Sequence, residues 1–174
     1  MKRIHSTRGF TLTEAMMTVA IVGIVSVALG RMMIYVSRFY RQTSARSDIQ
    51  RNVRTALDVI QRRLSEARGR SIVIDRLDGS QPHYSRLAFT DMDGKSITFY
   101  QQGTKLRSTV LSTGATQQTL LAENLRLMTF SYPLSDNAKL ISVGLAFEKA
   151  TYEGGTKSLQ LSLEKVRIQN PDAQ

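Results

Sequence analysis

Cysteine is absent from the 174-residue sequence, and histidine occurs only as His5 and His83. A chain without thiols can form neither a disulfide framework nor a thiolate zinc site. Two histidines are also too few for a histidine-rich metal site. We therefore assign no residue to a zinc or histidine-rich metal site, and the missing cysteines leave the redox compartment open.

Acidic residues are scarce in the first part of the chain, although the net charge of the whole sequence is +10. Residues 1–9 carry three basic groups, and residues 10–30 carry only Glu14. Residues 31–70 carry ten arginines against three acidic residues, whereas residues 71–174 are nearly neutral, with eleven basic and ten acidic groups. The basic charge thus belongs to the leader and one segment, and no aromatic residues accompany it in residues 46–70. We therefore expect no nucleic acid among the partners.

Proline and glycine are both absent from residues 31–68. Apolar residues recur there at helical spacing and fall within an arc of about 100°, which indicates an amphipathic helix. This stripe consists of Ile49, Val53, Ala56, Leu57, Ile60, Leu64 and Ala67. Since Gly69 is a plausible helix stop after Arg68, one helix is predicted from Phe10 to Arg68.

One long apolar run extends from Phe10 to Gly30, with Glu14 as its only charge. About 20 such residues span a bilayer as a helix. A secretory signal peptide is the alternative, but no small-residue cleavage site closes the run. We therefore expect an uncleaved, single-pass membrane helix. The charge rule does not settle its orientation, because basic residues flank both ends.

After Gly69 the apolar period changes to two, which predicts an antiparallel meander of about five to seven strands. The expected fold is therefore α+β, with a long N-terminal helix packed on a β-sheet. Ser112–Gln118 is expected to be a polar loop, and Gly154–Gly155 to join the last two strands. The strands are predicted at 71–76, 86–90, 96–101, 106–111, 120–132, 140–148 and 159–168.

Three short patterns suggest chemistry. Asp91 and Asp93, followed by Gly94, suggest a calcium loop, but the late glutamate of such a loop is missing and Asp-Gly suits a hairpin turn. Gly94-Lys95-Ser96 imitates a phosphate loop, yet Phe89 stands where its first glycine belongs. No catalytic motif occurs. We therefore expect a hairpin turn, no cofactor and no enzyme activity, while calcium binding by Asp91 and Asp93 stays open.

The strongest pattern is Arg8-Gly9-Phe10-Thr11-Leu12-Thr13-Glu14, directly before the apolar run. It resembles the signal of type IV pilin-like proteins. This resemblance implies cleavage after Gly9 by a prepilin peptidase, N-methylation of Phe10, and a role for Glu14 in filament assembly. Gly23 matches a glycine common in the family's helix, and we assign helix flexibility to Gly23 and Gly30.

The resemblance also implies an organisation and a location. Residues 1–9 would be the leader, 10–30 the transmembrane and assembly helix, 31–69 its amphipathic continuation, and 70–174 the sheet domain. The sheet domain would lie outside the cytoplasm, with the helix in the inner membrane. The implied partners are a prepilin peptidase, other pilin-like subunits and an inner-membrane assembly platform.

Within the family, the chain is similar to minor pilins and to the J-type minor pseudopilins of type II secretion. Residues 121–125, 130–133 and 166–170 carry this similarity. Arg31 replaces the usual proline of the helix, and the C-terminal cysteine pair of many major pilins is missing. The sequence does not distinguish pilus, secretion and DNA-uptake systems.

Glu14 has a physical reading that is independent of the family. A carboxylate within a membrane segment is costly and therefore indicates a function and a partner. Cleavage after Gly9 would free an α-amine on Phe10, which is positive near neutral pH. Two other hypotheses remain: Glu14 merely lies at the headgroup level, or the chain is an anchored extracytoplasmic binding module that never polymerises.

Overall fold

The computed structural model describes residues 9–133, 139–151 and 157–169. The chain divides into two compact units, Met1–Arg41 and Gln42–Gln174, which are described separately below. The predicted turn at Gly154–Gly155 lies outside the described residues. A single helix, α1 (Leu12–Ser65), provides the described helical residues of the first unit and begins the second.

Within the second unit, α1 buries one face. The whole predicted stripe is buried, which confirms the periodicity argument, and Ala45 extends the stripe by one turn. Charged residues lie outside this face. One of them, Asp48, forms an ion pair with Lys149 of strand β7 (Leu140–Ala150), in which Lys149 Nζ lies 2.7 Å from Asp48 Oδ2. Burial of the apolar face, rather than helix propensity alone, therefore holds this part of α1 in place.

The predicted helix end at Arg68 is wrong by three residues, because α1 ends at Ser65. The Ser65 hydroxyl donates to the Arg62 carbonyl at 2.8 Å. Ala67 then forms an isolated β-bridge with Asp91, and the Arg68 N–H donates to the Thr90 carbonyl at 2.9 Å. The backbone of these residues thus pairs with the sheet instead of continuing the helix. A short 3₁₀ turn, η1 (Gly69–Ser71), follows.

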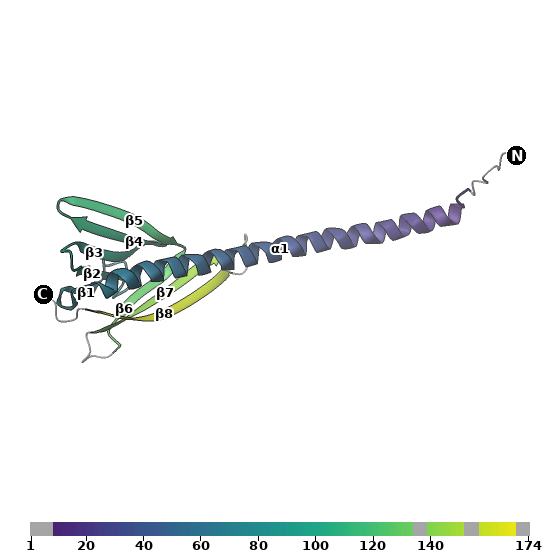
Figure 1. The fold of residues 1–174 in the computed structure, drawn as a ribbon. Coiled ribbons are helices and arrows are strands. Elements are labelled where there is room, and N and C mark those ends of the chain that lie inside the picture. Colours follow the sequence, from purple (N-terminus) through teal and green to yellow (C-terminus); the bar gives the residue numbers. More distant parts are fainter. Residues whose placement is uncertain (1–8, 134–138, 152–156, 170–174) are drawn as a thin grey trace. The chain divides into compact units, whose positions relative to one another are not determined.

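The strands form two antiparallel sheets instead of the single meander that was predicted. The first sheet is a meander in sequence order, and the second has the order β6-β7-β8 (Figure 1). The strands of the first sheet are β1 (Val73–Asp75), β2 (Arg86–Thr90), β3 (Ser96–Gln102), β4 (Lys105–Ser112) and β5 (Ala115–Glu123). Those of the second are β6 (Leu125–Ser131), β7 (Leu140–Ala150) and β8 (Lys157–Arg167). The α+β prediction is confirmed, since both sheets pack against the second-unit part of α1.

Two sequence predictions in this region are wrong. Ser112–Gln118 is not a loop: only Thr113 and Gly114 turn, both with positive φ, and β5 then pairs with β4. The long strand predicted over 120–132 is interrupted at Asn124, whose φ of 63° breaks the extended backbone. Asn tolerates this left-handed conformation better than most residues. The chain therefore leaves the first sheet after β5 and enters the second sheet at β6.

The core of the second unit is shared by helix and sheets. The largest fully buried side chains include Phe99 of the first sheet, Phe130 and Phe147 of the second, and Ile60 of α1. The apolar stripe of α1 and the buried residues of both sheets belong to one hydrophobic cluster. The second unit therefore contains its own complete hydrophobic core.

A fragment that lacks residues 1–38 is expected to be soluble and folded, because the core residues all follow the deleted segment. The exposed apolar residues of the first unit are removed almost completely. Cooperative unfolding in urea, followed by circular dichroism, tests this expectation. Aggregation of the fragment, or a broad non-cooperative transition, would show that the boundary is misplaced.

Candidate processing and assembly site

Gly9 and Phe10 lie at the start of the described chain, before α1 begins. The Phe10 side chain is 80% exposed. A Cβ built on Gly9 would meet no atom within 4 Å. Crowding within the described chain therefore does not require glycine at this position.

Thr11 and Glu14 form a reciprocal cap at the start of α1. The Thr11 N–H and the Thr11 hydroxyl both donate to Glu14 Oε2 at 3.0 Å, and the Glu14 N–H donates to Thr11 Oγ1 at 3.4 Å. The Ala15 N–H donates to the Thr11 carbonyl at 3.1 Å, which makes Thr11 the N-cap. This arrangement is a capping box, in which two backbone N–H groups that the helix leaves without partners are satisfied by side chains.

The capping box gives Glu14 a partner within its own chain. Thr11 is a residue of the candidate site that the sequence argument missed, although its spacing from Glu14 is the Thr-x-x-Glu signature of such a cap. Both bonds from Thr11 end on Oε2. Because an ionised carboxylate accepts several hydrogen bonds, Oε1 retains capacity for a cation such as an α-amine.

The apolar run is a regular part of α1 that leaves its side chains exposed in the first unit. An 18-residue window of this helix has a mean hydropathy of 2.1, so it is long and apolar enough to cross a membrane. Its hydroxyl groups are satisfied within the helix: Thr18 donates to the Glu14 carbonyl and Ser26 to the Val22 carbonyl, each at 2.7 Å. These local bonds suit a hydrocarbon environment, where no water replaces them.

Gly23 and Gly30 lie inside α1 with no atom within 4 Å of a built Cβ. Glycine in a helix interior costs about 1 kcal/mol relative to alanine. Within the described residues, no close contact at Gly23 or Gly30 offsets this cost. The helix is continuous through both positions, so their predicted role in helix flexibility stays a prediction.

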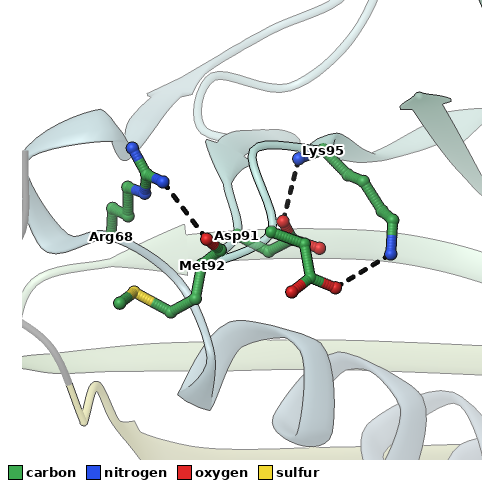
Figure 2. Close-up of polar contacts among 5 residues, drawn as sticks. Arg68, Asp91, Met92 and Lys95 are labelled. Atoms are coloured by element: carbon green, nitrogen blue, oxygen red, sulfur yellow. Dashed lines mark hydrogen bonds and ion pairs between the residues drawn. The ribbon is translucent and has the colours of Figure 1, made fainter. Parts of the chain in front are cut away.

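The Asp91–Lys95 loop between β2 and β3 is held by its own side chains and by residues that follow α1 (Figure 2). The Lys95 N–H donates to Asp91 Oδ1 at 2.9 Å, and the Gly94 N–H donates to the Asp91 carbonyl at 3.1 Å. The Arg68 guanidinium donates to the Met92 carbonyl at 3.2 Å. Asp91 is buried, and its carboxylate therefore shapes the hairpin turn, as the Asp-Gly pattern predicts.

Asp93 is exposed and interacts with the same lysine. Lys95 Nζ lies 2.9 Å from Asp93 Oδ2, and this hydrogen bond holds the pKa of the Asp93 carboxyl below its usual value. In the part of the chain that the structure describes, no group of three or more His, Asp or Glu residues is placed to hold a metal ion. The two aspartates thus act on Lys95 rather than on one another.

Calcium is expected to leave the thermal stability of the protein unchanged, because Asp91 and Asp93 already have partners within the loop. Differential scanning calorimetry measures the Tm of the protein with added calcium and with a chelator. A calcium-dependent rise in Tm would contradict the turn interpretation if the rise disappeared in the double variant Asp91→Asn with Asp93→Asn.

Comparison with known proteins identifies the N-terminal region. Residues 4–30 match the family model of the prokaryotic N-terminal methylation motif. A comparison of the chain with curated proteins gives no match. The matched segment contains Gly9, Phe10, the capping box and the apolar run described above. The chain therefore carries a type IV pilin-like prepilin signal at its N-terminus.

Proposed function

We propose that the protein is a minor pilin or pseudopilin subunit that a prepilin peptidase processes and that assembles through α1 into a filament. The observation that carries this proposal is the methylation motif over residues 4–30, placed directly before an exposed apolar helix. Cleavage falls after Gly9, Phe10 is N-methylated, and Glu14 makes the assembly contact. The role is structural, with no catalytic step.

The arrangement at the helix start supports this assignment. After cleavage, the α-amine of Phe10 stands one residue before the N-cap Thr11. A positive amine beside a helix N-terminus is electrostatically unfavourable, because the N–H groups there already carry partial positive charge. A carboxylate from a neighbouring subunit relieves this repulsion. Glu14 is such a carboxylate on every copy, at the depth where the helices would pack.

The proposed location follows from the same helix. The span over residues 10–30 inserts into the inner membrane, and the second unit lies outside the cytoplasm. The partners are the peptidase, other pilin-like subunits and an inner-membrane assembly platform. The small residues Gly23 and Gly30 support close approach of neighbouring helices, because small residues let helix backbones pack tightly in a membrane.

A second candidate is a membrane-anchored binding module that does not polymerise. The capping box favours it, because Glu14 then has a local role that needs no neighbouring subunit. In this case the chain would keep residues 1–9. The two candidates therefore differ in the N-terminal residue of the protein in the membrane.

The mature protein is expected to begin at Phe10 and to carry one methyl group on its α-amine. Intact-mass and N-terminal peptide mass spectrometry of membrane-purified protein measure both changes. A strain without prepilin peptidase serves as the control and should yield the unprocessed chain. Detection of Met1 or Lys2 at the N-terminus in a strain with active peptidase would instead support the anchored module.

A further inference from the structure

Apolar and polar residues alternate along strand β8, but the apolar residues are exposed and the polar residues between them are half-buried. Leu159, Leu161 and Leu163 are 61%, 72% and 69% exposed. The intervening residues Gln160 and Ser162 are half-buried. Since alternate residues of a strand point to opposite faces, the three leucines share the face that points away from the core. We call these three residues the β8 leucine face.

The β8 leucine face continues across the second sheet. Leu161 lies opposite Ala146 of β7, which in turn lies opposite Leu127 of β6. Leu127 is 38% exposed. The side chain of Leu163 leans over β7, where its Cδ1 would lie 3.6 Å from a Cβ built on Gly144. Contiguous exposed apolar surface of this kind marks an interaction site more often than isolated apolar residues do.

Strand β8 also offers backbone groups. Among the described strands it pairs with β7 alone, so it forms one edge of the second sheet (Figure 1). An edge strand presents a row of N–H and C=O groups that can pair with an added strand. Peptide recognition by strand addition uses these groups for affinity and alternate side chains for specificity. The β8 edge supplies both elements over the same residues.

The charges at the ends of β8 indicate whether a second copy of this chain or a segment of another protein pairs with its edge. Lys157 precedes the leucines and Lys165 follows them. An antiparallel pairing of two copies that sets every leucine opposite a leucine also sets Lys157 opposite Lys165. An in-register parallel pairing sets each lysine beside its equivalent. Like charges directly opposite one another destabilise a strand pair, so both arrangements disfavour a second copy of this chain.

We propose that the edge of β8 accepts an extended segment of another protein, with apolar residues at alternate positions and acidic residues at both ends. The apolar residues cover the β8 leucine face, and the acidic residues carry the charge opposite to that of the two lysines in the β8 sequence. This inference goes beyond the proposed filament role and does not depend on it. A strand of this composition satisfies the backbone edge, the apolar face and the charge together.

The test uses the full chain in nanodiscs of zwitterionic phosphatidylcholine and two synthetic peptides. Both peptides share a core of alternating valine and threonine, but one has glutamates at its ends and the other has lysines. Hydrogen exchange of the β8 amides, measured by mass spectrometry, is the readout. The glutamate-ended peptide is expected to slow this exchange about tenfold at saturation, and the lysine-ended peptide to leave it unchanged.

Two variants assign the effect to the β8 leucine face. Leu161→Lys is expected to abolish the slowing by placing a charge in the apolar face, whereas Leu161→Val should retain it. The matched control is Leu120→Lys, which alters a leucine that is 43% exposed on β5, the edge strand of the other sheet. This control should respond like the original chain. Unchanged exchange in the β7 amides shows that each variant is folded.

Four outcomes would overturn the proposal. They are no slowing by either peptide, equal slowing by both, or a response of Leu120→Lys that matches that of Leu161→Lys. The fourth is protection of β8 without peptide. If that protection rises with protein concentration, a second copy occupies the edge. If it requires anionic phosphatidylglycerol in the nanodiscs, the occupant is a lipid surface.

Discussion

Replacement of Glu14 by leucine is expected to reduce incorporation into filaments about tenfold or more, while membrane insertion and cleavage after Gly9 persist. Leucine makes the span more apolar, so the anchor improves. The cleavage signal resembles one centred on Gly9, which the substitution leaves in place. Assembly is lost because the Phe10 amine of a neighbouring subunit would enter an apolar bundle without a carboxylate. Co-purification with filaments at equal expression measures the effect.

The capping box makes a second variant necessary, because leucine removes the cap as well as the charge. Glutamine at position 14 can still accept the hydrogen bonds from Thr11, since capping boxes use Glu or Gln. If Glu14→Gln fails to assemble as Glu14→Leu does, the charge is the essential feature. If Glu14→Gln assembles normally, Glu14 acts as a helix cap and the proposed ion pair is wrong. Aspartate, which is one methylene shorter, should restore assembly only in part.

The helix was the part of the fold that could be predicted best from the sequence. Its apolar stripe repeats over several turns without proline or glycine, and burial of Ile49, Ile60 and Leu64 follows from that period. The position of its C-terminal end was harder to predict. The chain leaves the helix where Ala67 and Arg68 pair with the β2–β3 hairpin, and such a tertiary contact leaves no trace in local spacing.

Strand β5 shows why the sheet was harder to predict. Residues 115–120 of β5 are exposed, so they lack the alternation that burial of one face imposes. Their polar composition reads as a loop, although all of them pair with β4. In β8 the alternation is present but reversed, because its leucines face away from the core. A period of two predicts a strand, but it does not say which face is inside.

The candidate site was predictable in its residues but not in its contacts. Gly9, Phe10 and Glu14 were predicted from the motif, and the family match covers all three. The bonds between Thr11 and Glu14 could have been predicted as well, since their spacing alone is a capping signature. The proposed contacts between subunits have no signature in the fold of one chain, since Phe10 and Glu14 are exposed there.

Truncation of Ile60 to alanine is expected to lower the free energy of unfolding of the second unit by about 2–5 kcal/mol. Ile60 is fully buried, and its removal leaves a cavity where α1 meets the sheets. The matched control is Ile34→Ala, the same chemical change at a residue of α1 that is 57% exposed in the first unit. This control should leave the free energy of unfolding unchanged. Urea unfolding of the full chain in detergent, followed by circular dichroism, measures both variants.

The Ile60→Ala variant also tests whether processing at the N-terminus depends on the core of the second unit. Gly9 and Phe10 form the proposed cleavage site, whereas Ile60 lies in the core of the second unit. Processing is therefore expected to be unaffected in Ile60→Ala, and mass spectrometry should still find Phe10 at the N-terminus. If Ile60→Ala and Ile34→Ala alter the unfolding free energy equally little, α1 does not pack in the core. If Ile60→Ala instead blocks cleavage, the peptidase depends on the folded second unit.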